Sequence, residues 1–222
     1  MVTFVCDTGI VSGFLALPRD PSRHRAIIVI HEWWGLTPWV KSQASNLAKN
    51  GYVVLALDLY HGEVTPISSQ ARKLKRNLSL DQAIGEMKAA FDYLVRRANV
   101  DPKRIGAMGW SMGGSLALQL AMHEPRLAAC VVNYGALPTK LADIEKISAS
   151  TLGIFGSLDR GIPPKKVRAF EKRMNAVKKL VEIKIYDNAG HGFENPSNIL
   201  KFRPKTATDA WLRTLRFLNR SI

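Results

Sequence analysis

The segment Gly109-Trp110-Ser111-Met112-Gly113 carries the spacing Gly-x-Ser-x-Gly between two apolar runs. This pattern is typical of a strand, a tight turn and a buried helix with Ser111 at the bend, because glycine lets backbone segments approach closely. The free N–H groups at the start of such a helix, with the positive end of its dipole, stabilise an oxyanion formed by attack on a carbonyl. The motif by itself fits a plain glycine turn as well as a nucleophile, so its context decides.

Two further polar residues follow predicted strands. Asp159 comes just after residues 151–156, and His191 comes shortly after residues 180–186. A serine hydroxyl is a weak nucleophile, so His191 would take its proton and Asp159 would hold the imidazole in the right tautomer. An Asx turn or a helix N-cap is the alternative for Asp159. The chain order Ser111, Asp159, His191 is nevertheless the order found in α/β-hydrolases, which favours a catalytic triad.

The other histidines do not occupy such positions. His24, His61 and His123 are interpreted as surface or capping residues, and Asp187 as a turn former. His31-Glu32 lacks the second histidine of a His-Glu-x-x-His zinc motif, and no other cluster has the spacing of metal ligands. We therefore expect no metal.

Alternating strand and helix patterns must position these residues. Buried strands are predicted at 26–30, 52–57 and 127–133, with helices at 38–49, around Ile84 to Leu94 and at 115–122. Residues 2–17 predict two short antiparallel edge strands broken at Asp7-Thr8-Gly9, and the stretch after Gly62 is expected to be irregular. The final helix is expected to be capped by Thr206 or Thr208. The pattern predicts an α/β fold, with a mostly parallel central sheet of about seven or eight strands flanked by helices.

The connection before residue 151 is too short for a large helical cap domain, so the mouth of the site is expected to be open. With 222 residues, 46% of them hydrophobic, the chain is expected to form a single domain over residues 1–222. Its first residues lack the pattern of an export signal, and Cys6 and Cys130 have no disulfide or redox spacing. These features predict a cytoplasmic protein that does not span a membrane.

The chain has 32 Lys and Arg against 18 Asp and Glu, a formal net charge of +14. The basic residues alternate with apolar ones at helical spacing over residues 165–179, which favours a solvated helix face over a nucleic-acid surface. The charge should then attract anionic substrates. The alternative is a basic binding protein on an inactive hydrolase scaffold, with nucleic acid or an acidic partner as its target.

Five segments together resemble the dienelactone hydrolase family of α/β-hydrolases over nearly the whole chain. These segments are His31-Glu32-Trp33-Trp34-Gly35, Asp58-Leu59-Tyr60, Gly109-Trp110-Ser111-Met112-Gly113-Gly114, Gly156-Ser157-Leu158-Asp159 and Ala189-Gly190-His191-Gly192-Phe193. The resemblance implies a cofactor-free esterase or lactonase in which the backbone N–H groups of Met112 and Trp33 form the oxyanion hole. It also implies that Glu32 contacts the resting nucleophile, although Glu32 could instead anchor a loop.

The chain departs from the family's name enzyme at the nucleophile, which is a cysteine there and Ser111 here. The two arginines that hold the substrate carboxylate in that enzyme fall at Ser68 and Asn195 of this chain. Arg72 is a candidate replacement or a solvated helix residue. These departures point away from dienelactone and towards more general ester hydrolysis.

The sequence therefore predicts a serine hydrolase that cleaves small acyl esters or lactones. The aromatic residues Trp33, Trp34, Trp39, Tyr60 and Trp110 are candidates for the acyl pocket, although some of them fit the core equally well. The expected partner is a small-molecule ester or lactone, and the expected assembly is a monomer or a homodimer.

Overall fold

The computed structural model describes residues 1–7 and 9–222, so Thr8 in the predicted first turn lies outside the described residues. The strands are β1 Val2–Cys6, β2 Gly9–Ala16, β3 His24–Ile30, β4 Tyr52–Asp58, β5 Val100–Trp110, β6 Ala129–Asn133, β7 Ser150–Gly156 and β8 Val181–Tyr186. The helices are α1 Pro38–Lys49, α2 Ser68–Asn77, α3 Leu80–Val95, α4 Met112–His123, α5 Leu141–Glu145, α6 Pro164–Ala176 and α7 Pro204–Ser221.

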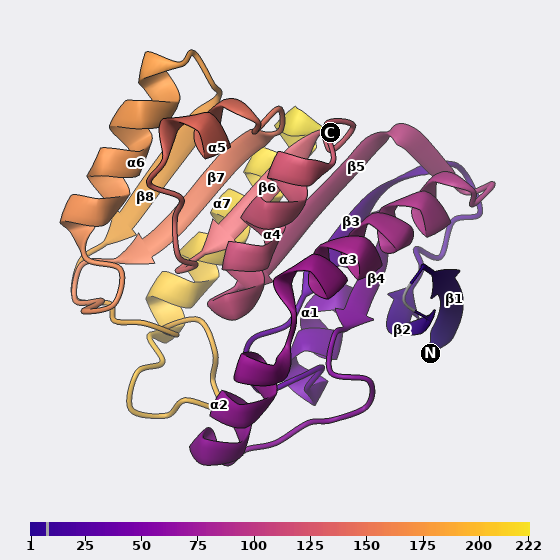
Figure 1. The fold of residues 1–222 in the computed structure, drawn as a ribbon, viewed down its shortest axis with the longest axis horizontal. Helices are drawn as coiled ribbons and strands as arrows, with labels where there is room; N and C mark the ends of the chain where they lie inside the picture. Colours follow the sequence, from indigo (N-terminus) through magenta and orange to yellow (C-terminus); the bar gives the residue numbers. More distant parts are fainter. Residues whose placement is uncertain (8) are drawn as a thin grey trace.

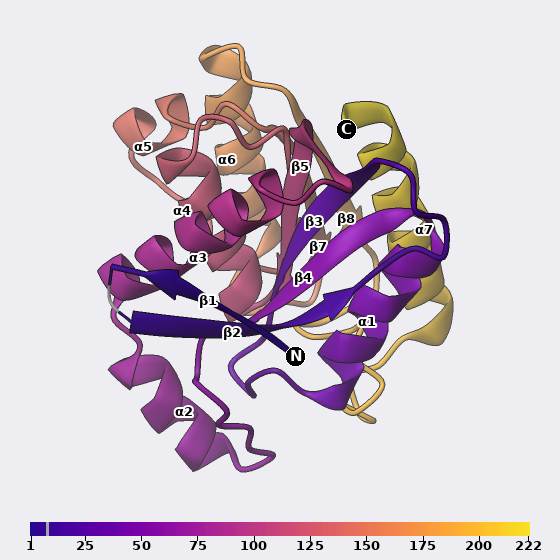
Figure 2. The same ribbon diagram turned by 90° about the vertical axis from the view of Figure 1, so that its right-hand side faces the viewer.

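All eight strands form one sheet in the order β1-β2-β4-β3-β5-β6-β7-β8. Strands β3 to β8 pair in parallel, whereas β1 pairs with β2 and β2 pairs with β4 in antiparallel fashion. Helices α3, α4 and α6 cover one face, and α1 and α7 cover the other (Figures 1 and 2). The core lies between the sheet and these two helix layers, and every residue of strand β4 is buried there. The predicted α/β fold with an antiparallel edge is confirmed.

The β-branched runs and the helix signals place most elements where the sequence predicts them. Helix α1 begins at Pro38, where Thr37 accepts a hydrogen bond from the Val40 backbone N–H at 3.4 Å, and it ends before Asn50-Gly51. In the described segment between β6 and β7, the five-residue helix α5 is the regular element that is present. This described connection therefore holds no large helical cap domain, as its length predicts.

The prediction of an irregular stretch after Gly62 is wrong in part, because residues 68–77 form helix α2. Ala71 is the buried residue of this helix, so its sequence lacks the apolar repeat by which buried helices are predicted. The predicted cap of α7 is also wrong. Arg203 is the N-cap, and Thr206 and Thr208 lie inside the helix. Pro204 supplies the start instead, since its fixed φ suits the first helical position.

Candidate active site

Ser111 lies at a strained bend between β5 and α4. Its φ of 52° and ψ of −113° place a residue with a Cβ atom in the left-handed region. A Cβ added to Gly109 would collide with the backbone of Gly113, and one added to Gly113 would collide with the Ile30 carbonyl oxygen. The two glycines therefore let α4 pack against the ends of β3 and β5, and this packing holds the serine in its bend.

The structure brings Ser111, His191 and Asp159 into one hydrogen-bonded row. The Ser111 hydroxyl lies 2.8 Å from Nε2 of His191, and Nδ1 of His191 lies 2.7 Å from Oδ2 of Asp159. An ionised Asp159 can only accept, so the ring nitrogen facing it carries the proton and Nε2 is left to accept from the serine. The three side chains follow β5, β8 and β7, whose parallel ends meet at one edge of the sheet.

Asp159 has the surroundings of a carboxylate that stays ionised. Burial alone would raise the pKa of Asp159, but hydrogen bonds from His191 and from the backbone N–H groups of Ile162 and Gly161 outweigh it and lower that pKa. The backbone donors lie 3.0 and 2.9 Å from Oδ1. The side chain is almost fully enclosed, whereas His191 is 37% exposed and reaches the cavity. The Asx-type turn expected as the alternative for Asp159 is thus present together with the histidine contact.

A cavity of about 370 Å³ opens above Ser111. Trp33, Trp34 and Met112 line it together with Ser111 and His191. Met112 is the first residue of α4, so its backbone N–H has no partner within the helix. The cavity also touches two exposed lysines, Lys75 on α2 and Lys201 on the segment before α7. Figure 1 shows that segment reaching towards α2.

Glu32 lines this cavity, but the hydrogen bond of its side chain is to Asn195 and not to Ser111. Its Oε2 accepts a hydrogen bond from the Asn195 amide at 2.7 Å. Burial raises the pKa of Glu32 to about 7, although this hydrogen bond and the nearby His191 act to lower it. Asn195, the position aligned with a family arginine, is thus buried against a carboxyl group. A contact between Glu32 and the resting nucleophile stays a prediction.

A second carboxyl group lies beneath the serine. Glu194 accepts a hydrogen bond from the indole N–H of Trp110 at 3.2 Å, and its other oxygen is buried with no partner among the described residues. Burial, opposed by the Trp110 hydrogen bond and helped by the charge of Glu32, raises the pKa of Glu194 to about 8. The hydroxyl of Tyr134 is likewise buried and unpartnered among the described residues, and its ring lies edge-on to His191 at 5.1 Å.

Three of the predicted substrate contacts lie away from the cavity wall. Trp110 is buried under the site, Tyr60 donates its hydroxyl proton towards the sulfur of Met112 at 3.2 Å, and Arg72 is exposed on α2. Lys75, four residues after the buried Ala71, is on the side of α2 that faces the protein and lines the cavity instead. Trp34 does line it, whereas Trp39 packs against Trp110 at 4.9 Å.

Sequence reasoning missed Lys75, Lys201, Tyr134 and Glu194. The sequence could have indicated Tyr134 and Glu194 as site residues. Tyr134 directly follows β6, and Glu194 lies three residues after His191. Both are therefore near the carboxyl edge of the sheet, where ligands bind in open α/β folds. The lysines had no such signal, because they belong to segments whose approach to the cavity depends on tertiary packing.

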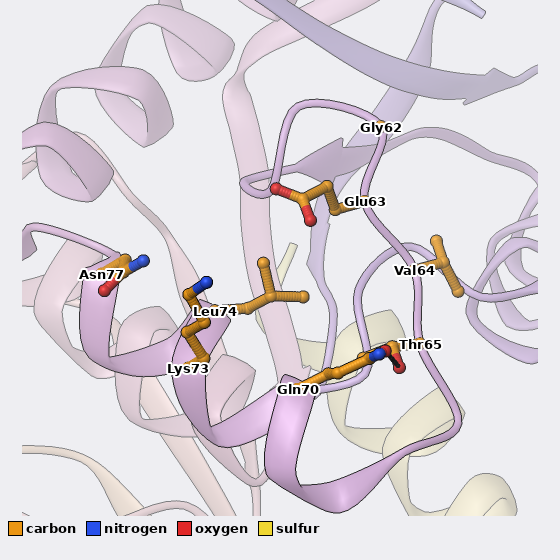
Figure 3. A pocket seen from close by; sticks show the side chains of 8 residues that line it. All are labelled: Gly62, Glu63, Val64, Thr65, Gln70, Lys73, Leu74 and Asn77. Carbon is orange, nitrogen blue, oxygen red and sulfur yellow. Dashed lines mark hydrogen bonds between the residues drawn. The ribbon is translucent and has the colours of Figure 1, made fainter.

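Other features of the structure bear on alternative functions. Among the residues that the structure describes, no group of three or more His, Cys, Asp and Glu side chains has the arrangement of a metal site. Within the same residues, no helix has the length and apolar content needed to cross a bilayer. A separate polar cavity of about 570 Å³ lies between residues 62–65 and α2 (Figure 3). It shares no lining residue with the cavity above Ser111.

The parallel sheet, the serine at a glycine-flanked bend and the histidine and aspartate after later strands define an α/β-hydrolase. Residues 11–222 match the model of the dienelactone hydrolase family, and the chain belongs to that family.

Relatives and solved structures agree with this placement. The chain is 32% identical to the "Probable 2-oxo-3-(5-oxofuran-2-ylidene)propanoate lactonase" of a Bradyrhizobium species, over 93% of this chain and 88% of that protein. It is 31% identical to the "Putative carboxymethylenebutenolidase" of Saccharolobus solfataricus, over 95% and 94%. The fold of the dienelactone hydrolase-like promiscuous phosphotriesterase P91, from metagenomic libraries, superposes with a TM-score of 0.88 at 21% identity, covering 99% and 96% of the two chains.

Proposed function

We propose that this protein is a serine hydrolase that cleaves carboxylic esters or lactones of small acyl substrates through an acyl-enzyme on Ser111. The observation that carries the proposal is the row of hydrogen bonds from the Ser111 hydroxyl to His191 and from His191 to Asp159, at 2.8 and 2.7 Å. Membership of the dienelactone hydrolase family supports the reaction class.

In the acylation step, Oγ of Ser111 attacks the carbonyl carbon while Nε2 of His191 takes the hydroxyl proton. The carbonyl π electrons move to the oxygen, and the backbone N–H groups of Met112 and Trp33 are the proposed donors to that oxyanion. When the tetrahedral intermediate collapses, the ester C–O bond breaks and the imidazolium returns its proton to the leaving alcohol oxygen. Asp159 stabilises the imidazolium in between.

Deacylation repeats these steps with water as the nucleophile. His191 removes a proton from the water as its oxygen attacks the acyl carbon, and the proton then returns to Oγ of Ser111 as the acid leaves. Ser111 is deprotonated only during attack, whereas a cysteine thiolate can form in advance. Because the serine needs no deprotonation in advance, we assign Glu32 no proton transfer. Its hydrogen bond instead holds the side chain of Asn195 in place.

The cavity supports a small acyl group. Its volume of about 370 Å³ lies at the low end of the range for ligand pockets, and Trp33 and Trp34 provide apolar walls. The names of the two relatives quoted above make lactones natural candidates. Ser68 lies exposed at the start of α2 and Asn195 is bonded to Glu32, so neither position offers the carboxylate contact of the family's name enzyme.

The test is hydrolysis of p-nitrophenyl acetate and a panel of lactones, including dienelactone, by the wild type and by Ser111→Ala. We expect turnover by the wild type and its loss in the variant, and a fluorophosphonate probe should label the peptide that contains Ser111. Ser69→Ala, at an exposed position of α2, is the matched control. Equal rates in wild type and Ser111→Ala would remove Ser111 from the mechanism.

The binding-protein alternative makes a different prediction. A basic binding protein would be retained on nucleic acid in a salt-sensitive manner and would turn over no ester. The same protein preparations can be passed over immobilised duplex DNA and RNA at low and high salt, and this outcome would replace the hydrolase proposal.

A further inference from the structure

A second hollow borders the active-site cavity on the side of α6. This hollow, which we call the α6 slot, has a volume of about 460 Å³ and lies between residues 136–139 and a side of α6 that extends from Gly161 and Ile162, just before the helix, to Arg173. Ala136 and Ile162 line both the α6 slot and the cavity above Ser111. The α6 slot and the cavity above Ser111 therefore border each other at these two residues.

The lining of the α6 slot combines apolar side chains with basic ones. Leu137, Pro138 and Ile162 provide apolar contacts, and Ala169 adds only a single methyl group to the lining. Lys165, Ala169 and Arg173 follow each other at intervals of four, which aligns them along one side of the helix.

The charges of the slot have one sign. Lys165, Lys166 and Arg173 line it, and none of its described lining residues is acidic. Lys166 is engaged with the Gly161 carbonyl oxygen at 3.2 Å. The ion pair found on α6 joins Arg168 to Glu171, which both lie outside the lining. Arg173 is half-buried, so an anion that reached it would be partly shielded from water, where a charge-assisted hydrogen bond gains strength.

We propose that the α6 slot is a specificity subsite for esters whose acyl chain is apolar and ends in a carboxylate. The chain would lie over Leu137, Ile162 and Ala169, and its carboxylate would bind Arg173 and Lys165. This inference rests on the proposed function, since the scissile carbonyl must lie at Ser111 for the distal end to reach the slot.

The test compares two p-nitrophenyl esters of equal length, the hydrogen suberate and the methyl suberate, with p-nitrophenyl acetate as a short reference. For the wild type we expect kcat/KM to be about tenfold higher for the carboxylate ester than for its methyl-capped partner, the gain of one charge-assisted hydrogen bond. Arg173→Gln should reduce this ratio towards one. Lys172→Gln removes the same charge from the neighbouring exposed position, outside the slot lining, and should keep the wild-type ratio.

A second variant tests the shape of the slot. Ala169→Leu places a larger side chain in its lining, so kcat/KM for both suberate esters should fall several-fold relative to the acetate. A wild type that hydrolyses the acetate but treats the two suberate esters alike overturns the subsite alone. The subsite is also overturned if Arg173→Gln and Lys172→Gln change the ratio equally. If the wild type hydrolyses none of the esters, the proposed function fails and the subsite fails with it.

Discussion

The indole N–H of Trp110 donates a hydrogen bond to the carboxyl group of Glu194 at 3.2 Å. Trp110 is the neighbour of Ser111 in the chain, and Glu194 lies three residues after His191. The contact thus ties the segment that carries the nucleophile to the segment that carries the base. It does so beneath the cavity, where the second carboxylate oxygen of Glu194 has no partner among the described residues.

This buried carboxyl group makes the stability of the protein depend on pH. Folding raises the pKa of Glu194 to about 8 and that of Glu32 to about 7, both from a usual value of 4.5. Between pH 4.5 and 8 the folded state therefore binds more protons than the unfolded state. The free energy of unfolding should fall as pH rises through this range. Glu194→Gln keeps the shape and hydrogen-bond acceptor but has no charge to bury.

We expect Glu194→Gln to be more stable relative to the wild type at pH 8.5 than at pH 5.5, by on the order of a few kcal/mol. Urea unfolding at the two pH values measures this difference. Glu63→Gln, at an exposed position, removes the same charge and should show no such dependence. If the two variants respond to pH alike, Glu194 does not ionise with a raised pKa.

Ser111 and His191 should act as one unit in catalysis. Each single alanine variant is expected to lower kcat by about 10⁴- to 10⁶-fold, because either loss disables the same proton transfer. The double variant should then be no slower than the slower single variant. Single-turnover rates with p-nitrophenyl acetate measure the three values, and circular dichroism checks the fold. Additive losses would mean that the 2.8 Å contact does not serve a shared step.

The glycine at position 113 should contribute to the stability of the fold as well as permit the bend. A Cβ atom there would collide with the Ile30 carbonyl oxygen, so Gly113→Ala is expected to lower the free energy of unfolding by about 1–3 kcal/mol. Gly85→Ala, in helix α3 where an added Cβ meets nothing within 4 Å, should instead be neutral or stabilising by about 0.5–1 kcal/mol. Urea unfolding of both proteins decides, and a Gly113→Ala variant as stable as Gly85→Ala would contradict the packing described for the bend.

Salt should affect anionic and neutral esters differently. The net charge of +14 and the two lysines at the cavity attract an anionic ester, and added salt screens this attraction over about 10 Å at 0.1 M. We expect kcat/KM for the carboxylate ester to fall several-fold with added sodium chloride, and that for a neutral ester of equal length to stay constant. An equal salt response of both esters would show that the field does not guide the substrate.

The sequence by itself determined the fold class and the three residues in the hydrogen-bonded row. The reason is steric and local, since a glycine-flanked serine between two apolar runs fits few backbone paths other than a strand, a bend and a helix. Asp159 and His191 were also predictable, because each follows a buried strand and the ends of parallel strands meet at one edge.

Only the tertiary structure decided what surrounds that row. Helix α2 buries little more than Ala71, so neither its existence nor the approach of Lys75 to the cavity could be predicted from apolar periodicity. The pairing of Trp110 with Glu194, and of Glu32 with Asn195, joins residues that are far apart in the sequence. Such contacts form only when distant segments pack together. The residues next to each side chain in the sequence therefore do not indicate its partner.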